Sequence, residues 1–484
     1  MAIKYTPAQQ KAIDTTDKSI LVSAAAGSGK TAVLVQRIIE MVCKENGPDI
    51  DKLLVVTFTN AAAAEMKDKI YQAIMKKIAE NPSDKRLKRQ LLLLPNSNIQ
   101  TMHGFCLNVI KQNINMLNIP MNFRITNEAE TMILKQRCIA ELIEDKYLEE
   151  DTDFLELADT YGYGRNDKKI VDMILAYDHF TSSLSNPDAY FDKCMSSATA
   201  VTKDFSKSIY GEFIIHQLQE ILADNEIGYH KAIKEIELKP DLAPYYEIFA
   251  QELLFIKKLQ TLCKSNNFRE IQAEILSFSF VAFRVKGVKA GTDNTFIKNL
   301  RENFKTDIGK FIPLISNSLE HEQNDYKEVL KFIKVLSQLT KEFSERYQAE
   351  KQKRALLDFS DFEHLALKVL SDENGNPSEI AKSYQQRFHE ILIDEYQDTN
   401  DIQDHLFRLI SKNGENLFLV GDVKQSIYGF RHAKPQIFIE KQETYQDEKH
   451  EVIYLSNNFR SRKEVVEGVN VIFKKLMTPK KPHR

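Results

Sequence analysis

The sequence lacks the features that mark several classes of protein. Its five cysteines form no C-x-x-C pair and no cluster with histidine, which argues against a zinc site, an iron–sulfur cluster or a disulfide framework. Residues 1–7 do not resemble a signal peptide, and no apolar run approaches the ~18 residues that a membrane span needs. We therefore expect a cytoplasmic protein with free thiols and no contact with a membrane.

An excess of positive charge is also absent. The net charge is −3, so any binding of nucleic acid must come from local basic surfaces and not from the chain as a whole. Charge alone does not suggest DNA. The 484 residues exceed the ~250–300 at which a single hydrophobic core stops growing, so the length predicts at least two domains.

The most informative pattern lies in residues 19–31. An apolar run leads into Gly-Ser-Gly-Lys-Thr, which predicts a buried strand, a tight turn and a helix start, as in a phosphate-binding P-loop. Glycines let backbone N–H groups meet an oligophosphate, and the helix start adds its positive dipole end. Lys30 is placed to reach the β- and γ-phosphates of ATP, and Thr31 to bind Mg²⁺. Ala24 stands where the general motif has its first glycine. The candidate phosphate-binding residues are Ser23, Ala24, Ala25, Ala26, Gly27, Ser28, Gly29, Lys30 and Thr31.

Four further apolar runs predict buried strands of a parallel sheet, at residues 52–59, 389–393, 416–420 and 451–455. Each run ends in polar residues. Ligands collect at the carboxyl ends of such strands, so one nucleotide site served by several loops explains them all. The region from 127 to 354 instead has helical periodicity and few motifs. Because a P-loop needs an acidic strand end beside it, we predict a helical domain inserted into an α/β sheet domain.

Asp394 and Glu395 follow the second of these runs. Neighbouring residues at a strand end point to different sides, so Asp394 fits a Mg²⁺ ligand and Glu395 the base that activates the attacking water. Paired acids are often merely solvated, but these follow a buried strand in a P-loop protein. Gln425 is a candidate sensor of the γ-phosphate, and Arg460 a candidate source of positive charge for the transition state.

Five stretches resemble motifs of one family, in the family's order. They are 24–31, 57–66, 394–400, 421–431 and 455–461, which resemble motifs I, Ia, II, III and IV of superfamily 1A (UvrD-like) DNA helicases. Within that superfamily, Thr-Met-His-Gly-Phe-Cys at 101–106 and Val-Gly-Asp-Val-Lys-Gln-Ser-Ile-Tyr at 420–428 resemble the AddA (RexA) helicase–nuclease subunits. Ala32 and Ala61 are AddA-like departures from the UvrD pattern.

The resemblance implies an ATP-dependent motor that moves 3′ to 5′ on single-stranded DNA in double-strand break repair, with an AddB-like partner. It implies two RecA-like lobes with Mg²⁺ and ATP between them. Gln9, which could otherwise be an ordinary surface glutamine, and Arg37 would face the base, Phe459 would stack on adenine, and Arg460 would be the arginine finger. As isolated residues, Phe58 and Phe430 would more often be core. The residues implied to line the DNA path are Phe58, Thr59, Asn60, His103, Tyr428, Phe430 and Arg431.

The predicted organisation is a RecA-like domain in two parts, 1–126 and 355–448, a helical insertion at 127–354, and the start of a second lobe at 449–484. On the family pattern, motifs V and VI and the nuclease domain would lie beyond Arg484, so we expect no nuclease activity from these residues. Two alternatives stay open. One is a stand-alone UvrD-like repair helicase; the other is an ATP- and DNA-end-binding assembly module without productive hydrolysis.

Overall fold

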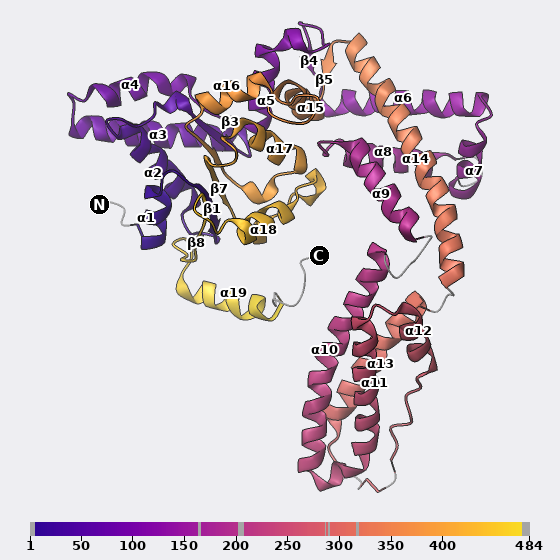
Figure 1. The fold of residues 1–484 in the computed structure, drawn as a ribbon. Helices are drawn as coiled ribbons and strands as arrows, with labels where there is room; N and C mark the ends of the chain where they lie inside the picture. The colour runs from indigo at the N-terminus through magenta and orange to yellow at the C-terminus, as the bar shows by residue number, and fades with distance from the viewer. Residues whose placement is uncertain are drawn as a thin grey trace. The chain divides into compact units, whose positions relative to one another are not determined.

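The computed structural model describes residues 5–162, 166–201, 208–285, 287–288, 291–315 and 319–476 (Figure 1). The chain forms two compact units. The sheet unit comprises Met1–Glu149, Val171–Pro187 and Thr340–Arg484, and the helical unit comprises Glu150–Ile170 and Asp188–Leu339. The α/β sheet domain and the helical insertion expected from the sequence are therefore both present.

A six-stranded parallel sheet organises the sheet unit, in the order β3-β2-β6-β7-β1-β8. Its strands are β1 (Ser19–Ala24), β2 (Leu53–Thr57), β3 (Asn98–Thr101), β6 (Glu390–Ile393), β7 (Leu417–Gly421) and β8 (His450–Leu455). Because both faces are covered by helices, the strands are nearly continuous apolar runs, which is why they could be located from the sequence. All of their pairings are parallel, so their carboxyl ends share one edge.

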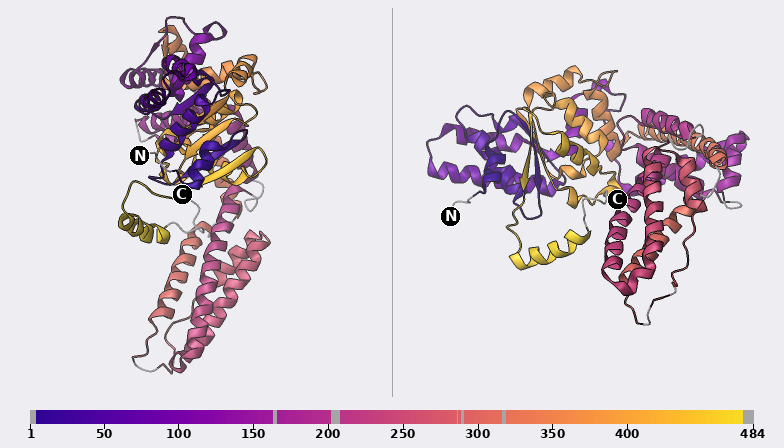
Figure 2. Two further views of the ribbon diagram at one scale, coloured as in Figure 1. Left: turned by 90° about the vertical axis from the view of Figure 1, so that its left-hand side faces the viewer. Right: turned by 60° about the horizontal axis from the view of Figure 1, so that its bottom comes forward.

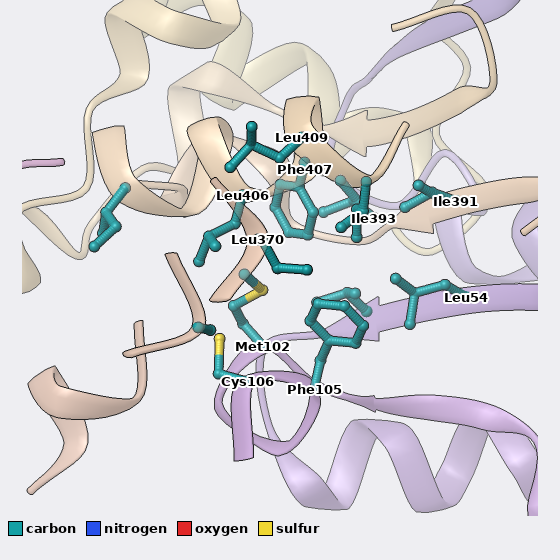
Figure 3. Packing of buried hydrophobic residues seen from close by; sticks show 14 of the residues in the cluster. Leu54, Met102, Phe105, Cys106, Leu370, Ile391, Ile393, Leu406, Phe407 and Leu409 are labelled. Atoms are coloured by element: carbon teal, nitrogen blue, oxygen red, sulfur yellow. The ribbon is translucent and has the colours of Figure 1, made fainter. Parts of the chain in front are cut away.

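Successive residues of the strands serve two separate cores. Leu54 and Ile391 belong to one core, which Figure 3 shows packed with Met102, Phe105 and Phe407, whereas neighbouring strand residues such as Leu53 belong to the other. This alternation is the pleat of a strand with apolar side chains on both faces. In the right-hand view of Figure 2, the indigo helices and the orange helices lie on opposite sides of the sheet.

The sheet unit's helices follow the strands in the alternating pattern expected for a parallel sheet. They are α1 (Pro7–Asp14), α2 (Lys30–Cys43), α3 (Asn60–Glu80), α4 (Lys85–Leu93), α5 (Met102–Gln112), α6 (Glu128–Leu148), α15 (Phe359–Leu370), α16 (Glu379–Arg387), α17 (Asp401–Ile410), α18 (Pro435–Thr444) and α19 (Lys463–Leu476). A small second sheet pairs β4 (Arg124–Ile125) with β5 (Leu356–Leu357). Three short 3₁₀ turns lie at the carboxyl edge of the main sheet: η6 (Tyr396–Asp398), η7 (Val423–Gln425) and η8 (Gly429–Arg431).

The helical unit has a core of its own. Its helices are α7 (Thr152–Tyr161), α9 (Pro187–Val201), α10 (Ile209–Leu238), α11 (Tyr246–Lys264), α12 (Phe268–Ser277) and α13 (Thr295–Ile315), while α8 (Lys168–Thr181) and α14 (Leu319–Lys353) continue into the sheet unit. At its centre the buried carboxylate of Glu252 accepts hydrogen bonds from Arg301 Nε and Tyr229 Oη, both at 2.8 Å. No helix among the described residues is long and apolar enough to cross a bilayer.

Two predicted boundaries differ from the structure. The insertion predicted at 127–354 is too wide, because α6, residues 171–187 and the end of α14 belong to the sheet unit. Arg346 and the buried Lys351 show why: they bind Asp145 of α6 and the carboxylates around the start of α15, respectively. The boundary predicted at 449 is wrong, since β8 pairs with β1 along its whole length and completes the first sheet.

Candidate nucleotide and nucleic-acid site

The loop between β1 and α2 has the conformation that phosphate binding requires. Gly27 and Gly29 have φ angles of 71° and 85°, the left-handed region that glycine enters without a steric cost. Gly29 is the residue immediately before α2, so the helix presents its unpaired N–H groups at this loop. The Ser28 hydroxyl is buried without a hydrogen-bond partner. This orphaned donor and the exposed helix start fit an oligophosphate.

Lys30 and Glu395 meet across the edge of the sheet. Lys30 Nζ lies 2.8 Å from Glu395 Oε2, which joins the P-loop to the residue two positions past the end of β6. Glu395 itself has a φ of 52°, a strained conformation for a residue with a side chain and one that is concentrated at functional sites. The predicted P-loop lysine and the predicted base are therefore brought together.

Asp394 is the buried acid of the site. Burial, together with the neighbouring Glu395 carboxylate, raises the pKa of Asp394 to about 6. A nearby cation would offset both effects. The described residues contain no cluster of three or more His, Cys, Asp or Glu able to hold a metal by themselves. That donor set fits Mg²⁺, which takes one or two protein oxygens and completes its shell with phosphate and water. Thr31 follows Lys30 at the start of α2 and offers a hydroxyl of the same kind.

Gln425 lies in η7, just after β7, the strand between β6 and β1. Its Nε2 donates to Asp422 Oδ2 at 2.8 Å. The predicted γ-phosphate sensor is thus located at the carboxyl edge between the strand of the P-loop and the strand of the acids, with its amide oriented by a neighbouring carboxylate.

A cavity of about 230 Å³ lies beside the P-loop, between the start of α1 and the end of β8. Its lining residues are Thr6, Pro7, Ala8, Gln9, Ser28, Tyr454, Leu455, Ser456, Asn457 and Phe459. Gln9 Nε2 donates to Ser28 O at 2.9 Å, and its Oε1 accepts from Thr6 N in a capping box. Each group of the amide retains capacity for one more hydrogen bond. The exposed Phe459 ring supplies a flat apolar face, so the cavity suits a planar base.

The loop after β8 is fastened to the P-loop. Phe459 N donates to Gly27 O and Asn458 Nδ2 donates to Ala26 O, both at 2.8 Å. Arg460 also lies against the P-loop, since a Cβ added to Gly27 would come within 2.9 Å of the Arg460 Cβ. Asn458 was missed by the sequence analysis, although its place between polar residues after a buried strand was the available signal.

The prediction for Arg37 is wrong. Its guanidinium is buried beneath the sheet's helices, paired through two nitrogens with the carboxylate of Glu390. It also donates to Ala12 O and Thr15 O, at 2.8 and 2.7 Å, and lies over the Phe418 ring. With its donors engaged in this way, Arg37 ties α1 and α2 to β6 and is not available to a base.

An aromatic cluster forms where two loops meet at the carboxyl edge. We define it as Phe58, which follows β2, with Tyr428, Phe430 and Arg431 of the loop after β7. The Phe58 and Tyr428 ring centroids are 4.4 Å apart, and those of Tyr428 and Phe430 are 5.6 Å apart. The Arg431 guanidinium lies 5.6 to 5.9 Å from all three rings. Phe430 is 67% exposed, so the cluster offers a flat, positively charged surface.

The other predicted DNA-path residues are less uniform. Thr59 accepts from Ala62 N and caps α3, whose first residue is Asn60, and both side chains are exposed beside Phe58. His103 has separate neighbours: it lies 3.6 Å from the buried Glu363 carboxylate and edge-on to Phe359. Phe359, half exposed at the first turn of α15, was missed because its pairing with His103 depends on the tertiary fold.

Comparison with known proteins agrees with this geometry. The family model for the UvrD/REP helicase N-terminal domain matches residues 5–446. This chain belongs to the UvrD/REP helicase family. Its parallel sheet and P-loop are accordingly the RecA-like fold that the motifs predicted, and the family is one of ATP-dependent DNA helicases.

Curated relatives of this UvrD/REP-family chain share one name, which describes the first subunit of an ATP-dependent helicase/nuclease. The protein from Clostridium acetobutylicum is 39% identical over 502 residues, covering 98% of this chain and 40% of the relative. Those from Clostridioides difficile and Acetivibrio thermocellus are 40% and 38% identical, over 98% of this chain and 39% of each relative. The resemblance to AddA is confirmed. The chain spans about 40% of the length of these relatives.

Proposed function

We infer that this chain is the ATP-binding motor portion of an AddA-type helicase–nuclease, which hydrolyses ATP to move 3′ to 5′ on single-stranded DNA in double-strand break repair. The observation that carries the proposal is the contact between Lys30 and Glu395, which unites a P-loop with an acidic strand end at one edge of the sheet. The relatives' printed name supports the same activity.

Each residue of the edge has a task that its chemistry fits. Bound Mg²⁺ and ATP would supply the cleavable phosphoanhydride and the charge that neutralises it. Lys30 exchanges its partner Glu395 for the phosphates, which frees that carboxylate to take a proton from water. Asp394 and Thr31 provide oxygen ligands for the metal. Gln425 orients the terminal phosphate or the attacking water, and Arg460 adds positive charge.

The aromatic cluster is the proposed contact with single-stranded DNA. Bases stack on aromatic rings whatever their identity, and Arg431 can bind a phosphate or stack as well, so the surface has affinity without sequence preference. His103 and Phe359 would extend this path along α5 and α15. The proposal includes an AddB-like partner, since the relatives are named as one component of a larger enzyme, and a cytoplasmic location.

The deciding experiment measures ATP binding and ATP turnover by this chain, with and without single-stranded DNA, at low and moderate salt. Turnover that DNA stimulates and salt weakens supports the motor. Nucleotide and DNA binding without turnover would support the assembly module instead. A chain that binds neither ligand would contradict both.

The DNA surface can be tested separately. Replacing Phe430 by Ala should lower the affinity for oligo(dT) by about 1–3 kcal/mol, the usual worth of one base stacked on one ring. Phe213→Ala, which removes a similarly exposed ring of the helical unit, is the matched control and should leave the affinity unchanged. Equal losses in the two variants would remove the aromatic cluster from the DNA path.

A further inference from the structure

Gln397 is a buried glutamine with both ends of its amide engaged. It is 1% exposed, in η6 directly after the acidic strand end. Its Nε2 donates to Glu395 Oε2 at 2.8 Å and to Asp398 Oδ2 at 3.1 Å, while its Oε1 accepts from Asp422 N at 3.0 Å. One planar group therefore joins the carboxylate proposed as the base to the loop that follows β7.

The residue at the end of β7 is shaped to admit this side chain. A Cβ added to Gly421 would lie 2.4 Å from Gln397 Oε1, far inside van der Waals contact, and 3.0 Å from Phe438 Cε2. Glycine at this position is thus required by the close approach of the amide and not by an unusual backbone conformation. The sequence commits two positions, 397 and 421, to a single contact.

Further hydrogen bonds carry the connection along the loop. Ser426 Oγ donates to Gln397 O at 3.2 Å, and the Asp422 carboxylate accepts from Gln425 Nε2 at 2.8 Å. On the far side of the aromatic cluster, Lys434 N donates to Thr399 O at 3.0 Å. Segments 395–399 and 422–434 are consequently fastened at several points, and a shift of one must displace the other.

We propose that Gln397 is a positioning residue that couples the Glu395 carboxylate to the aromatic cluster, so that nucleotide and single-stranded DNA each alter the affinity for the other. The proposal rests on the proposed function. Glu395 Oε2 receives both Lys30 and Gln397, and phosphate that draws Lys30 away leaves Gln397 as the remaining donor. The carboxylate then settles toward Gln397, whose other end holds the backbone of the loop that carries Tyr428 and Phe430.

The test is a linkage measurement on this chain. The affinity for fluorescent oligo(dT) is measured with and without Mg²⁺ and a slowly hydrolysed ATP analogue, in the wild type and in two variants. Coupled sites commonly change each other's affinity by about 5- to 150-fold. In Gln397→Met, which keeps the shape and removes both hydrogen bonds, we expect that factor to fall to within about twofold of one, while each ligand alone still binds.

Gln397→Glu separates the two ends of the amide. It can still accept from Asp422 N but cannot donate to Glu395, so it should lose the coupling as Gln397→Met does. Gln90→Met is the matched control: Gln90 is equally buried in the same unit and bonds Ile50 N and Asp49, so its loss lowers the melting temperature without touching the linkage.

Three results would overturn the inference: a wild type without linkage, coupling retained in both Gln397 variants, or coupling lost equally in Gln90→Met. A wild type that binds neither nucleotide nor DNA would instead contradict the proposed function. The two failures are therefore distinguishable in one set of titrations.

Discussion

Two ion pairs join the same helix to the same strand, yet they differ in almost every physical respect. Lys30 and Arg37 lie two turns apart on α2; Lys30 pairs with Glu395 just beyond the carboxyl end of β6, and Arg37 pairs with Glu390 at its first residue. The side chains of Lys30 and Glu395 are 13% and 36% exposed, whereas those of Arg37 and Glu390 are 1% and 8% exposed.

The difference teaches how one kind of contact serves two purposes. Arg37 meets a carboxylate through two nitrogens, two backbone carbonyls and an aromatic ring, so nothing is left for a ligand. We call this the closed pair. Lys30 meets one carboxylate oxygen that also accepts from Gln397, at an edge that solvent reaches. This open pair is held weakly enough to exchange its partner for a phosphate.

The largest expected effect comes from the open pair. Glu395→Gln keeps the size of the side chain but removes its basicity, so ATP turnover should fall by about 10²- to 10⁴-fold, the usual contribution of a general base. ATP binding should persist, as measured by fluorescence with a labelled nucleotide. Glu415→Gln, which alters an exposed pair with Lys449 at the opposite end of β7, is the control. Turnover within tenfold of the wild type would remove Glu395 from its role.

The closed pair should instead decide stability. Arg37→Met leaves the Glu390 carboxylate buried without its counter-charge, which typically costs about 3–5 kcal/mol in the free energy of unfolding. Urea denaturation followed by circular dichroism measures this loss. Lys30→Met, at the partly exposed pair, should cost no more than about 1 kcal/mol. Similar losses in both variants would erase the distinction between the pairs.

These pairs also mark how far the sequence alone could lead. The P-loop and the strand before Asp394 were predictable because their signals are local: apolar runs, glycines and the residues that follow them. Arg37 was misassigned because spacing places it on the same helix as Lys30 but carries no information about depth beneath the sheet. Glu390 looked like an ordinary strand residue until folding brought α1, α2 and β6 together.

Contacts between distant segments were equally beyond reach. The membership of β8 in the first sheet depends on its pairing with β1, more than 400 residues earlier in the chain, and no local pattern encodes that choice. The hydrogen bonds from Asn458 to Ala26 and from Gln397 to Glu395 and Asp422 arise from the same closure of the sheet edge. Motif order predicted which loops meet, but not which side chains fasten them.

Ligand binding sharpens the comparison further. Lys30→Met should weaken the affinity for Mg²⁺ and ATP by about 10- to 100-fold, since hydrogen bonds to charged groups are worth about 1.5–3 kcal/mol. A nucleotide at 100 times its Kd stabilises the wild type by about 2.7 kcal/mol, which a thermal shift reports, and the shift should largely vanish in this variant. Arg37→Met, although less stable, should keep the nucleotide-dependent shift. A lost shift in Arg37→Met would mean that the closed pair also shapes the site.

The smallest effect separates the pairs most sharply. When Glu390 is also replaced in Arg37→Met/Glu390→Met, no charge remains buried, and paired replacements of this kind are often close to neutral. The carbonyls of Ala12 and Thr15 still lose their donor, so we expect a net loss of about 1–2 kcal/mol, less than for Arg37→Met alone. A double-mutant cycle in urea measures this recovery. The corresponding double replacement at Lys30 and Glu395 should recover no ATP binding, because the partner that matters there is the nucleotide and not the other side chain.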